Sequence, residues 1–450
     1  MGVTARLAEF VAKTPSSKIS DQALDAGNVG LFDAVGTALV ANTHDIGKII
    51  TGYTNTLGGN PTATVIGTKI KTSAPDAALA NGTLGHSDDY DDVGGFGHPS
   101  VILMPTVLAL GEQLHKSGRE VLEAYALGFE VGTRIGNGIG ADHYGRGWHS
   151  TSTLGTMAAA AAASRLLGLD TDHTRTALGI AASLASGVQA NFGTMTKPLH
   201  PGNGARSGIV AATLAQMGYS ANQDVIEAPL GYVAVFGDQQ ANINAMTTHL
   251  GEAPLHVISA IRIKEWPCCY GHHGVIPMLL DIVHKYEVRP EQVERVDFIS
   301  GMAHGFLNRP DANTYFGGKF SLQFNIAAAL VDRDVNYQTF TDAKINSAPI
   351  RDMMARVHLS EDPMVAPLPA RIRSAHQDQK VVVTLKDGRQ LTEEIEHATN
   401  TLRGHQVDIK FEANASQVLP SAQAKQALNA FRDLKKVKDV AEIMPLVALH

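Results

Sequence analysis

The chain has 450 residues, of which 44% are hydrophobic, and its formal net charge at neutral pH is −7. This length exceeds what one hydrophobic core commonly serves, so we expect two domains. The acidic balance gives no reason to expect nucleic acid or an anionic membrane surface as a partner. The two cysteines, Cys268 and Cys269, are too few for an iron–sulfur cluster or a structural zinc site, and we interpret them as packing residues.

The first fifteen residues carry a charge every few positions and lack the apolar core of a signal peptide. No window of the sequence approaches the roughly 18 consecutive apolar residues that a membrane helix needs. From these two observations we expect a cytoplasmic protein that does not enter a membrane.

The first 265 residues have the hydrophobic periodicity of helices and are rich in Ala and Gly. The pattern predicts helices at 21–40, 101–115, 120–135, 152–167, 172–186 and 204–217. Asp170 and Thr171 are suited to cap the helix at 172–186. Residues 158–163 are all Ala, which requires close packing on several sides. Short turns between helices of this length predict a domain of antiparallel packed helices.

The pattern changes near residue 255. Residues 293–299 alternate like a strand, and 380–385 with 390–395 predict a hairpin. Further helices are expected at 273–286, 321–331, 408–415 and 422–435. We therefore predict a two-domain fold: a large all-α helical domain of residues 1–265, completed by 400–450, and a smaller inserted α+β domain of residues 266–399.

A glycine-rich loop at residues 85–100 has the least ordinary composition of the chain. It reads GHSDDYDDVGGFGHPS and contains two histidines and four aspartates: His86, His98, Asp88, Asp89, Asp91 and Asp92. Carboxylates this close together repel one another unless cations lie beside them, and glycines let other groups approach. The loop could bind a metal ion, or it could be a solvated surface loop. We favour a site in which one aspartate and His98 face a substrate.

Three later segments could supply the cations. His149 directly precedes the Ala-rich helix, where free backbone N–H groups stabilise anions, although a structural histidine also fits that position. Lys197 precedes Pro198, which predicts extended or turn backbone and a side chain that can enter a cavity, although most lysines lie on the surface. His273 lies near the predicted domain boundary, where a cleft is expected.

These segments, in this order, resemble the MmgE/PrpD family over nearly the whole chain. The resemblance rests on the motifs HSDDYDD at 86–92, HPS at 98–100, WHST at 148–151, TKPLH at 196–200 and KEWP at 264–267. The family includes 2-methylcitrate dehydratase, cis-aconitate decarboxylase and iminodisuccinate epimerase. Such an ordered set of motifs is specific for the family but much less so for the substrate.

The resemblance implies a helical domain with an inserted α+β lid domain, usually in a homodimer. It also implies an enzyme that removes a proton next to a carboxylate of a small di- or tricarboxylate, without a metal or an organic cofactor. Carried over by position, the catalytic residues would be Asp89, His98, His149, Lys197 and His273. Three further residues would contact the substrate: His86, Tyr144 and His200.

Two positions depart from the pattern of the family's lyases. Val93 stands where dehydratases and decarboxylases usually have Thr, and Phe324 stands where a Tyr is common among the decarboxylases. Elimination needs a donor aimed at the leaving group, whereas proton transfer alone does not. We therefore expect an epimerase of the iminodisuccinate type. A lyase acting on a methylcitrate-like or aconitate-like acid is the alternative, and a non-catalytic polycarboxylate-binding protein is the second.

Overall fold

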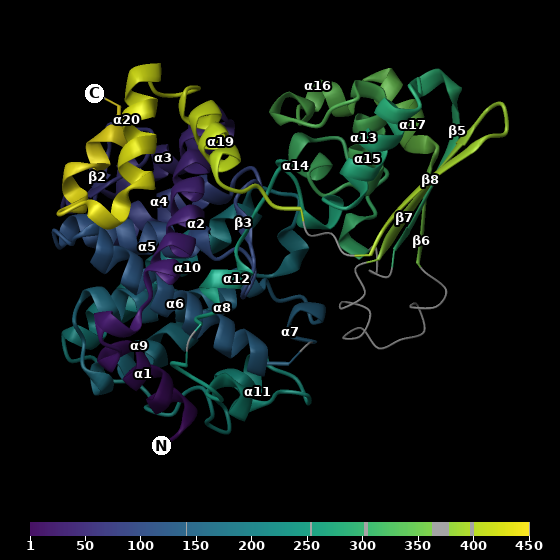
Figure 1. Cartoon of the computed structure of the whole chain (residues 1–450). Helices are drawn as coiled ribbons and strands as arrows, with labels where there is room; N and C mark the ends of the chain where they lie inside the picture. The colour runs from purple at the N-terminus through teal and green to yellow at the C-terminus, as the bar shows by residue number, and fades with distance from the viewer. Residues whose placement is uncertain (141, 253, 301–304, 362–377, 397–399, 450) are drawn as a thin grey trace.

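The computed structural model describes residues 1–140, 142–252, 254–300, 305–361, 378–396 and 400–449 (Figure 1). Over these ranges the chain is mostly helical and has small sheets. Its buried hydrophobic residues form two clusters, one among the helices and one beside the largest sheet.

The first cluster lies among long helices of the N-terminal part and two helices of the C-terminal tail. The N-terminal helices are α1 (Val3–Lys13), α2 (Asp21–Val40), α3 (Asp45–Leu57), α4 (Ala74–His86), α5 (Ser100–Gln113), α6 (Gly118–Gly138), α8 (Ser150–Leu166), α9 (Thr171–Leu184) and α10 (Thr196–Gln216). The tail contributes α19 (His405–Ala415) and α20 (Ser421–Arg432). Phe411 of α19 packs against Phe32 of α2 with 6.1 Å between ring centroids, so the tail returns to the N-terminal helices (Figure 1).

The helices predicted from periodicity are present, and the caps explain where several of them begin. Asp170 accepts the backbone N–H of His173 at 2.9 Å and starts α9, as predicted. Ser117 and Glu120 form a reciprocal capping box at the start of α6. The six alanines from 158 to 163 are all fully buried inside α8, because helices pack on several of its sides.

Helix α10 begins at Thr196, eight residues before the predicted start at 204. The prediction that Lys197 lies in extended or turn backbone is therefore wrong, since Lys197 is in the first turn of a helix. Pro198 is tolerated there because the first N–H groups of a helix have no partner within it. Pro201 lies further inside the same helix, also before the predicted start.

Helices α4 and α10 approach each other closely, and this contact positions the polar loop. A Cβ atom on Gly82 would lie 2.8 Å from the Cα atom of Gly202, a separation that real Cβ atoms do not adopt. Both positions therefore require glycine. The contact brings the end of α4, where the loop begins at His86, to the first turns of α10. Helix α4 itself was not predicted, since its buried residues surround it and leave little amphipathic pattern.

The second cluster draws on residues 266–395 and on Phe192. Its sheet has the strand order β6-β5-β7-β8, with β5 parallel to β6 and antiparallel to β7. The strands are β5 (Val293–Ser300), β6 (Val357–Glu361), β7 (Gln379–Leu385) and β8 (Gln390–Ile395). The helices beside them are α13 (Val275–Lys285), α15 (Leu322–Asp332) and α17 (Ala348–Ala355) (Figure 1). The predicted hairpin is confirmed, with Gly388 in its turn at φ 86°, whereas β6 was not predicted.

Shorter elements connect these parts. The helices among them are α7 (Asp142–Gly145), α11 (Tyr232–Phe236), α12 (Val257–Ala260), α14 (Tyr315–Gly318) and α16 (Asp342–Ile345). Strands β1 (Ala63–Thr64) and β2 (Lys71–Thr72) pair antiparallel, as do β3 (Asp92–Val93) and β4 (Arg262–Ile263). The pairing of β3 with β4 joins the polar loop to the segment that leads into the second cluster.

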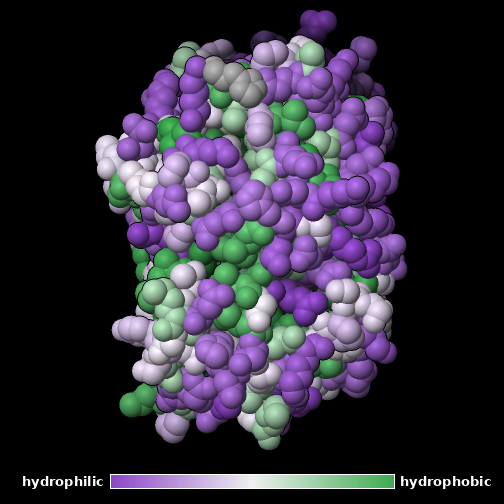
Figure 2. Space-filling view, turned by 90° about the vertical axis from the view of Figure 1, so that its left-hand side faces the viewer, coloured by the Kyte–Doolittle hydropathy of each residue, from purple (hydrophilic) through white to green (hydrophobic). Residues whose placement is uncertain are grey.

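Two features bear on whether the protein meets a membrane or a partner, namely one long apolar helix and the apolar side chains on the surface. Among the residues that the structure describes, one helical stretch, Asp21–Thr43, is long and apolar enough to cross a membrane, but 83% of its apolar window is buried inside the protein, as in a core helix. Figure 2 shows one face of the molecule, on which apolar side chains gather near the middle among polar ones. On α3, Ile49, Tyr53 and Leu57 are exposed at intervals of four residues and form an apolar stripe. The expected homodimer stays a prediction.

Candidate active site

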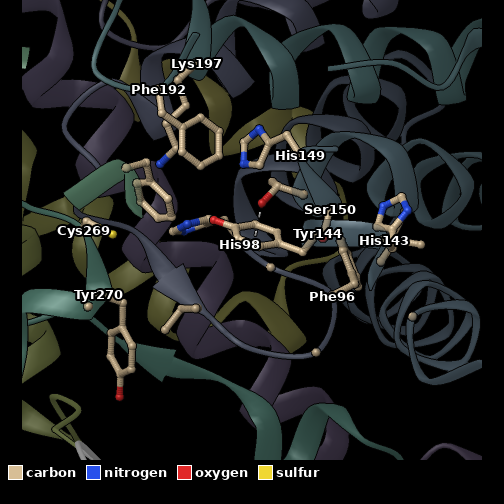
Figure 3. A pocket seen from close by; sticks show the side chains of 18 of the residues that line it. Phe96, His98, His143, Tyr144, His149, Ser150, Phe192, Lys197, Cys269 and Tyr270 are labelled. Atoms are coloured by element: carbon tan, nitrogen blue, oxygen red, sulfur yellow. Dashed lines mark hydrogen bonds between the residues drawn. The ribbon is translucent and has the colours of Figure 1, made fainter. Parts of the chain in front are cut away.

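A cavity of about 460 Å³ is lined by all four segments that the sequence indicated and by residues of both hydrophobic clusters (Figure 3). Its polar wall is formed by side chains from the glycine-rich loop and the first turns of α8 and α10: His98, His149, Ser150, Thr151 and Lys197. The apolar side chains of the lining include Phe96, Leu154, Phe192, Phe306 and Phe320, and further polar ones include Asn137, His143 and Gln379. A ligand here would meet nitrogen donors and hydrocarbon close together, because Phe192 and Phe320 lie beside Lys197.

The short β3–β4 pair sets the inner end of this site. Asp92 pairs with Ile263 and Val93 with Arg262, so the next residue, Lys264, lies beside the aspartates. Lys264 is fully buried and its Nζ donates to the backbone carbonyl of Asp89 at 2.8 Å and to the Asp89 carboxylate. Asp89 has a left-handed backbone with φ 50°, which is uncommon outside glycine and turns its carboxylate toward the lysines.

Two buried lysines share the Asp89 carboxylate. Lys264 approaches one oxygen, and Nζ of Lys197 lies 3.0 Å from the other. Burial alone would raise the pKa of Asp89, but the two lysines hold it well below its usual value. Lys197 also lies over the rings of Phe320 and Phe192, with Nζ 4.7 and 5.3 Å from the centroids. Lys197 is therefore fixed in one position at the cavity wall.

Asp91 orients two histidines. Its carboxylate oxygens lie 2.8 Å from Nδ1 of His86 and 3.0 Å from Nδ1 of His98, and the latter atom also lies 2.9 Å from the carbonyl oxygen of Asp92. Because Nδ1 of His98 faces only acceptors, we assign its proton to Nδ1, which leaves the lone pair of Nε2 free. Burial lowers the pKa of His98, so the ring is neutral at neutral pH.

His149 occupies the N-cap of α8, and its ring is held on two sides. Nδ1 lies 3.0 Å from Nδ1 of His200, and the ring meets Phe192 edge-on with 4.8 Å between centroids. Burial and the charge of Lys197 hold the pKa of His149 well below its usual value. The ring is therefore a neutral imidazole placed at the positive end of a helix dipole.

The other two aspartates of the loop point away from the cavity. Asp88 lies 3.2 Å from Nζ of Lys319 and accepts the hydroxyl of Tyr337 at 2.5 Å. Asp92 accepts the backbone N–H and the hydroxyl of Ser100 at 3.1 and 2.7 Å. Asp88 thus links the polar loop to the residues of the second cluster, and Asp92 links it to the start of α5.

The structure separates the predicted site residues into two groups. His98, His149, Lys197 and Tyr144 line the cavity. Tyr144 is 40% exposed at the rim and contacts Phe306 with 6.4 Å between ring centroids. Asp89 lies behind Lys197 and does not line the cavity.

Three further predicted residues do not line the cavity: His86 and His200, predicted to contact the substrate, and His273, predicted to be catalytic. His86 is 1% exposed and contacts Asp91, because it ends the buried helix α4. His200 lies behind His149, one turn along α10 from Lys197. His273 is fully buried between Trp266 and Tyr270, with ring centroids 5.1 and 5.0 Å away, and it does not line the cavity. A substrate in this cavity would not touch these three side chains.

Sequence reasoning missed two residues that organise the site. Lys264 belongs to the KEWP motif, but nothing in its neighbours shows that β4 would pair with the polar loop. Asp91 lay within the loop, but its role follows only from the positions of both histidines. The available signal for Lys264 was the KEWP motif itself. If the lysine of that motif is buried, it must have an anionic partner, and the aspartate-rich loop offers one.

The structure also shows where the two positions that depart from the family's lyases and the two cysteines lie. Val93 lines the cavity, so its departure from Thr affects the wall directly. Phe324 is fully buried in the second cluster against Phe340 and does not line the cavity, so the argument that its missing hydroxyl affects the site is wrong. Cys268 packs in the second cluster as expected, whereas Cys269 lines the cavity as a thiol whose pKa is raised by burial.

Four side chains near Lys197 are of types that bind metal ions. Possible ligand atoms of His86, Asp89, Asp91 and His98 all lie within 4.8 Å of one another. However, two lysines already neutralise Asp89, and the Nδ1 atoms of both histidines are engaged with Asp91. Nε2 of His86 has no hydrogen-bond partner among the described residues, so the histidines could offer only their Nε2 atoms, and a metal ion would have to compete with the two lysines for Asp89.

Comparison with known families agrees with this geometry along the chain. Residues 5–244 match the MmgE/PrpD N-terminal domain, and residues 266–436 match the MmgE/PrpD C-terminal domain. The chain belongs to the MmgE/PrpD family. The second matched region begins at residue 266, shortly after β4.

Several proteins are similar to this chain over nearly their whole length. The chain is 27% identical to the cis-aconitate decarboxylase of Homo sapiens over 461 residues, which cover 99% of this chain and 94% of that protein. It is 24% identical to the cis-aconitate decarboxylase of Aspergillus terreus over 486 residues, which cover 99% and 96%. A cis-aconitate decarboxylase-like protein of Aspergillus oryzae is 28% identical, with 99% and 97% covered.

Proposed function

We propose that this protein is a cofactor-free lyase that removes CO2 from a small polycarboxylate such as cis-aconitate. The observation that carries the proposal is the grouping of His98, His149 and Lys197 in one cavity that phenylalanine side chains also line. Relatives that are similar over 99% of this chain are decarboxylases, which supports a lyase. The expected epimerase finds no support among these relatives.

The apolar and the cationic side chains of the cavity suit the two products of decarboxylation. A carboxylate that faces phenylalanine rings loses hydration and is favoured to leave as neutral CO2. In cis-aconitate, the C–C bond to a carboxylate one carbon away from the double bond breaks, and its electron pair forms a new double bond. The displaced π pair moves to the carbon beside another carboxylate, where a cation stabilises the negative charge. Lys197 is placed to supply that cation.

The histidines then serve binding and protonation. A polycarboxylate next to His98 would raise its pKa, and Asp91 would stabilise the imidazolium that forms, so we assign His98 to charge neutralisation. The new carbon–hydrogen bond needs a proton, and we assign its delivery to His149, which lines the cavity at the start of α8. The first-turn N–H groups of α8 favour a remaining carboxylate nearby.

We further propose that the α+β region acts as a lid domain of residues 266–399 over the helical domain of residues 1–265 and 400–450. The two separate hydrophobic clusters support this division, and the cavity is lined by residues of both. Lys319, which pairs with Asp88, would connect the lid to the polar loop. A homodimer in the cytoplasm stays our expectation for the assembled enzyme.

The proposal is tested by incubating the purified protein with cis-aconitate and measuring CO2 and the resulting dicarboxylate. We expect CO2 and dicarboxylate in equal amounts, with one solvent deuterium incorporated per product in D2O. Other candidate acids, including 2-methylcitrate, are measured in parallel. Absence of CO2 release from every acid would overturn the decarboxylase, and loss of water from 2-methylcitrate would instead identify a dehydratase.

One observation favours a second candidate, an epimerase of an amino- or imino-dicarboxylate. Val93 lines the cavity where the family's lyases usually have a Thr hydroxyl, and proton transfer without a leaving group needs no donor there. His98 and His149 would then act as the two proton carriers. The same D2O experiment distinguishes this candidate, since deuterium would enter iminodisuccinate without release of CO2.

A further inference from the structure

The contact between His149 and His200 has a consequence for where protons can lie. Nδ1 of His149 is 3.0 Å from Nδ1 of His200. A hydrogen bond between two imidazole nitrogens needs one donor and one acceptor, so one Nδ1 atom carries a proton and the other does not. In neutral rings the tautomers are therefore linked. When His200 donates, the proton of His149 is on Nε2, and when His149 donates, the proton of His200 is on Nε2.

Both rings are held in this arrangement by the surrounding backbone. The backbone N–H of His149 donates to the carbonyl of Gly187 at 3.1 Å, and the hydroxyl of Ser152 donates to the carbonyl of His200 at 3.1 Å. Gly187 has φ 114°, and a Cβ atom there would lie 3.3 Å from Nδ1 of His200. Glycine at this position therefore leaves room for the histidine pair.

The two ends of the pair have different surroundings. His149 lines the cavity and is 2% exposed, whereas His200 does not line it and is 8% exposed. Nε2 of His200 has no hydrogen-bond partner in the described part of the chain, and it is not a fully buried atom. The pair therefore extends from the cavity toward the protein exterior.

We propose that His200 and His149 form a two-ring proton relay that carries a proton from solvent to the substrate carbon. This inference rests on the proposed decarboxylation, which consumes one proton for each CO2 released. His149 gives the proton of Nε2 to the carbon, the Nδ1 proton of His200 moves to Nδ1 of His149, and a hydronium ion or buffer acid protonates Nε2 of His200. Both rings end neutral, and water that enters after product release restores the starting tautomers.

A single histidine could not perform this step in the same surroundings. A neutral imidazole that gives up its only proton becomes an imidazolate, which is far too basic to form near neutral pH. The alternative is an imidazolium, but burial and the nearby charge of Lys197 hold the pKa of His149 well below its usual value. Unlike His98, which has Asp91, His149 has no carboxylate beside its ring among the described residues. The second ring removes the need for either charged form.

The relay is tested with His200→Asn, whose amide can still hydrogen-bond to Nδ1 of His149 but cannot pass a proton on. We expect kcat for CO2 release to fall by roughly a hundredfold with KM changed only a few-fold. In mixtures of H2O and D2O, single-turnover rates of the wild type should depend on deuterium content along a curve, because more than one proton moves. The variant should give a straight line. The control is His173→Asn at an exposed position of α9, which should match the wild type.

The relay is wrong if His200→Asn keeps most of its activity, or if it loses activity while the deuterium dependence stays curved. A second measurement does not depend on turnover. Protein labelled with 15N-histidine should show nitrogen–nitrogen coupling across the bond between the two Nδ1 atoms, and the coupling should vanish in the variant. Absence of the coupling in the wild type would also overturn the relay. Absence of CO2 release by the wild type, with the coupling present, would overturn the proposed function instead.

Discussion

Asp91 and Asp92 are neighbours in one loop and both are fully buried, yet the pKa values of their carboxyl groups are shifted in opposite directions. Burial raises the pKa of both groups. At Asp91 the two histidines outweigh burial and hold the pKa well below its usual value. At Asp92 burial is reinforced by the charge of Asp91, and hydrogen bonds from Ser100 are too weak to offset it, so the pKa is raised to about 8.

The comparison shows that the partner of a carboxylate, rather than its depth, decides its charge in this site. Asp91 is an anion that fixes the proton of His98 on Nδ1. Asp92 is a protonated acid at neutral pH that ties the loop to Ser100, whose hydroxyl also lies 2.6 Å from the hydroxyl of Tyr125. Consecutive residues in extended chain point to opposite sides, so one half of the loop serves the cavity and the other serves the helical core.

Lys197→Ala is expected to have the largest effect on the charged groups that serve the cavity. This substitution removes the cation at the cavity wall and leaves Asp89 with Lys264 alone. We expect kcat/KM for CO2 release to fall by roughly a hundredfold or more, the scale of a lost electrostatic or acid–base group. The measurement is steady-state CO2 release with circular dichroism as a check of folding. Lys13→Ala, at an exposed lysine on α1, is the matched control and should behave as wild type.

Asp91→Asn tests whether the anion orients His98. The amide offers one acceptor and one donor to two histidines that both donate through Nδ1, so one ring must change its tautomer or lose its bond. We expect kcat to fall by about tenfold to a hundredfold, since a wrong tautomer disables an Asp–His pair. Substrate affinity should change less than kcat. Equal activity of Asp91→Asn and wild type would show that the reaction does not depend on the orientation of His98 by Asp91.

Asp92→Asn should have a much smaller effect on activity, within a few-fold, because an amide resembles the protonated acid. Its main effect is on how stability depends on pH. The unfolded chain releases this proton near pH 4, whereas the folded chain keeps it up to about pH 8. The folded wild type therefore binds more protons between these values, and its stability falls as pH rises.

The variant lacks this titration, so the stability of the wild type relative to Asp92→Asn should decrease from pH 4 to pH 8. The expected change is on the order of 5 kcal/mol, from about four pKa units at about 1.4 kcal/mol each. Urea unfolding of both proteins at several pH values measures it. A difference between the two proteins that does not vary with pH would contradict a raised pKa for Asp92.

Much of the fold could be predicted because long amphipathic helices and the alternating hairpin follow local rules. Helix α2, for example, begins and ends at the predicted residues, 21 and 40. Helix α4 escaped prediction because buried residues surround it, and the early start of α10 was hidden by two prolines. These failures share one cause, namely that tertiary contacts rather than local periodicity stabilise the segments.

The candidate site was predictable as a set of segments but not as a set of contacts. The motifs located His98, His149 and Lys197, which the structure places together at one wall. They could not show that His86, His200 and His273 lie behind that wall, since which face of a loop or helix is covered depends on distant residues. The contact of Lys264 with Asp89 depends on a two-residue strand pair, too short to leave a pattern.

The smallest effect is expected from removal of metal ions. Of the four possible ligands, the carboxylate of Asp89 is bound by two lysines, and Nδ1 of His86 and His98 is engaged with Asp91, which leaves only the Nε2 atoms of the two histidines. A divalent cation placed there would meet two ammonium groups at close range, which is unfavourable in a buried site. Dialysis against a strong chelator should therefore leave CO2 release unchanged. A loss of activity that one added divalent ion restores would show that a metal ion, as well as the lysines, neutralises the aspartates.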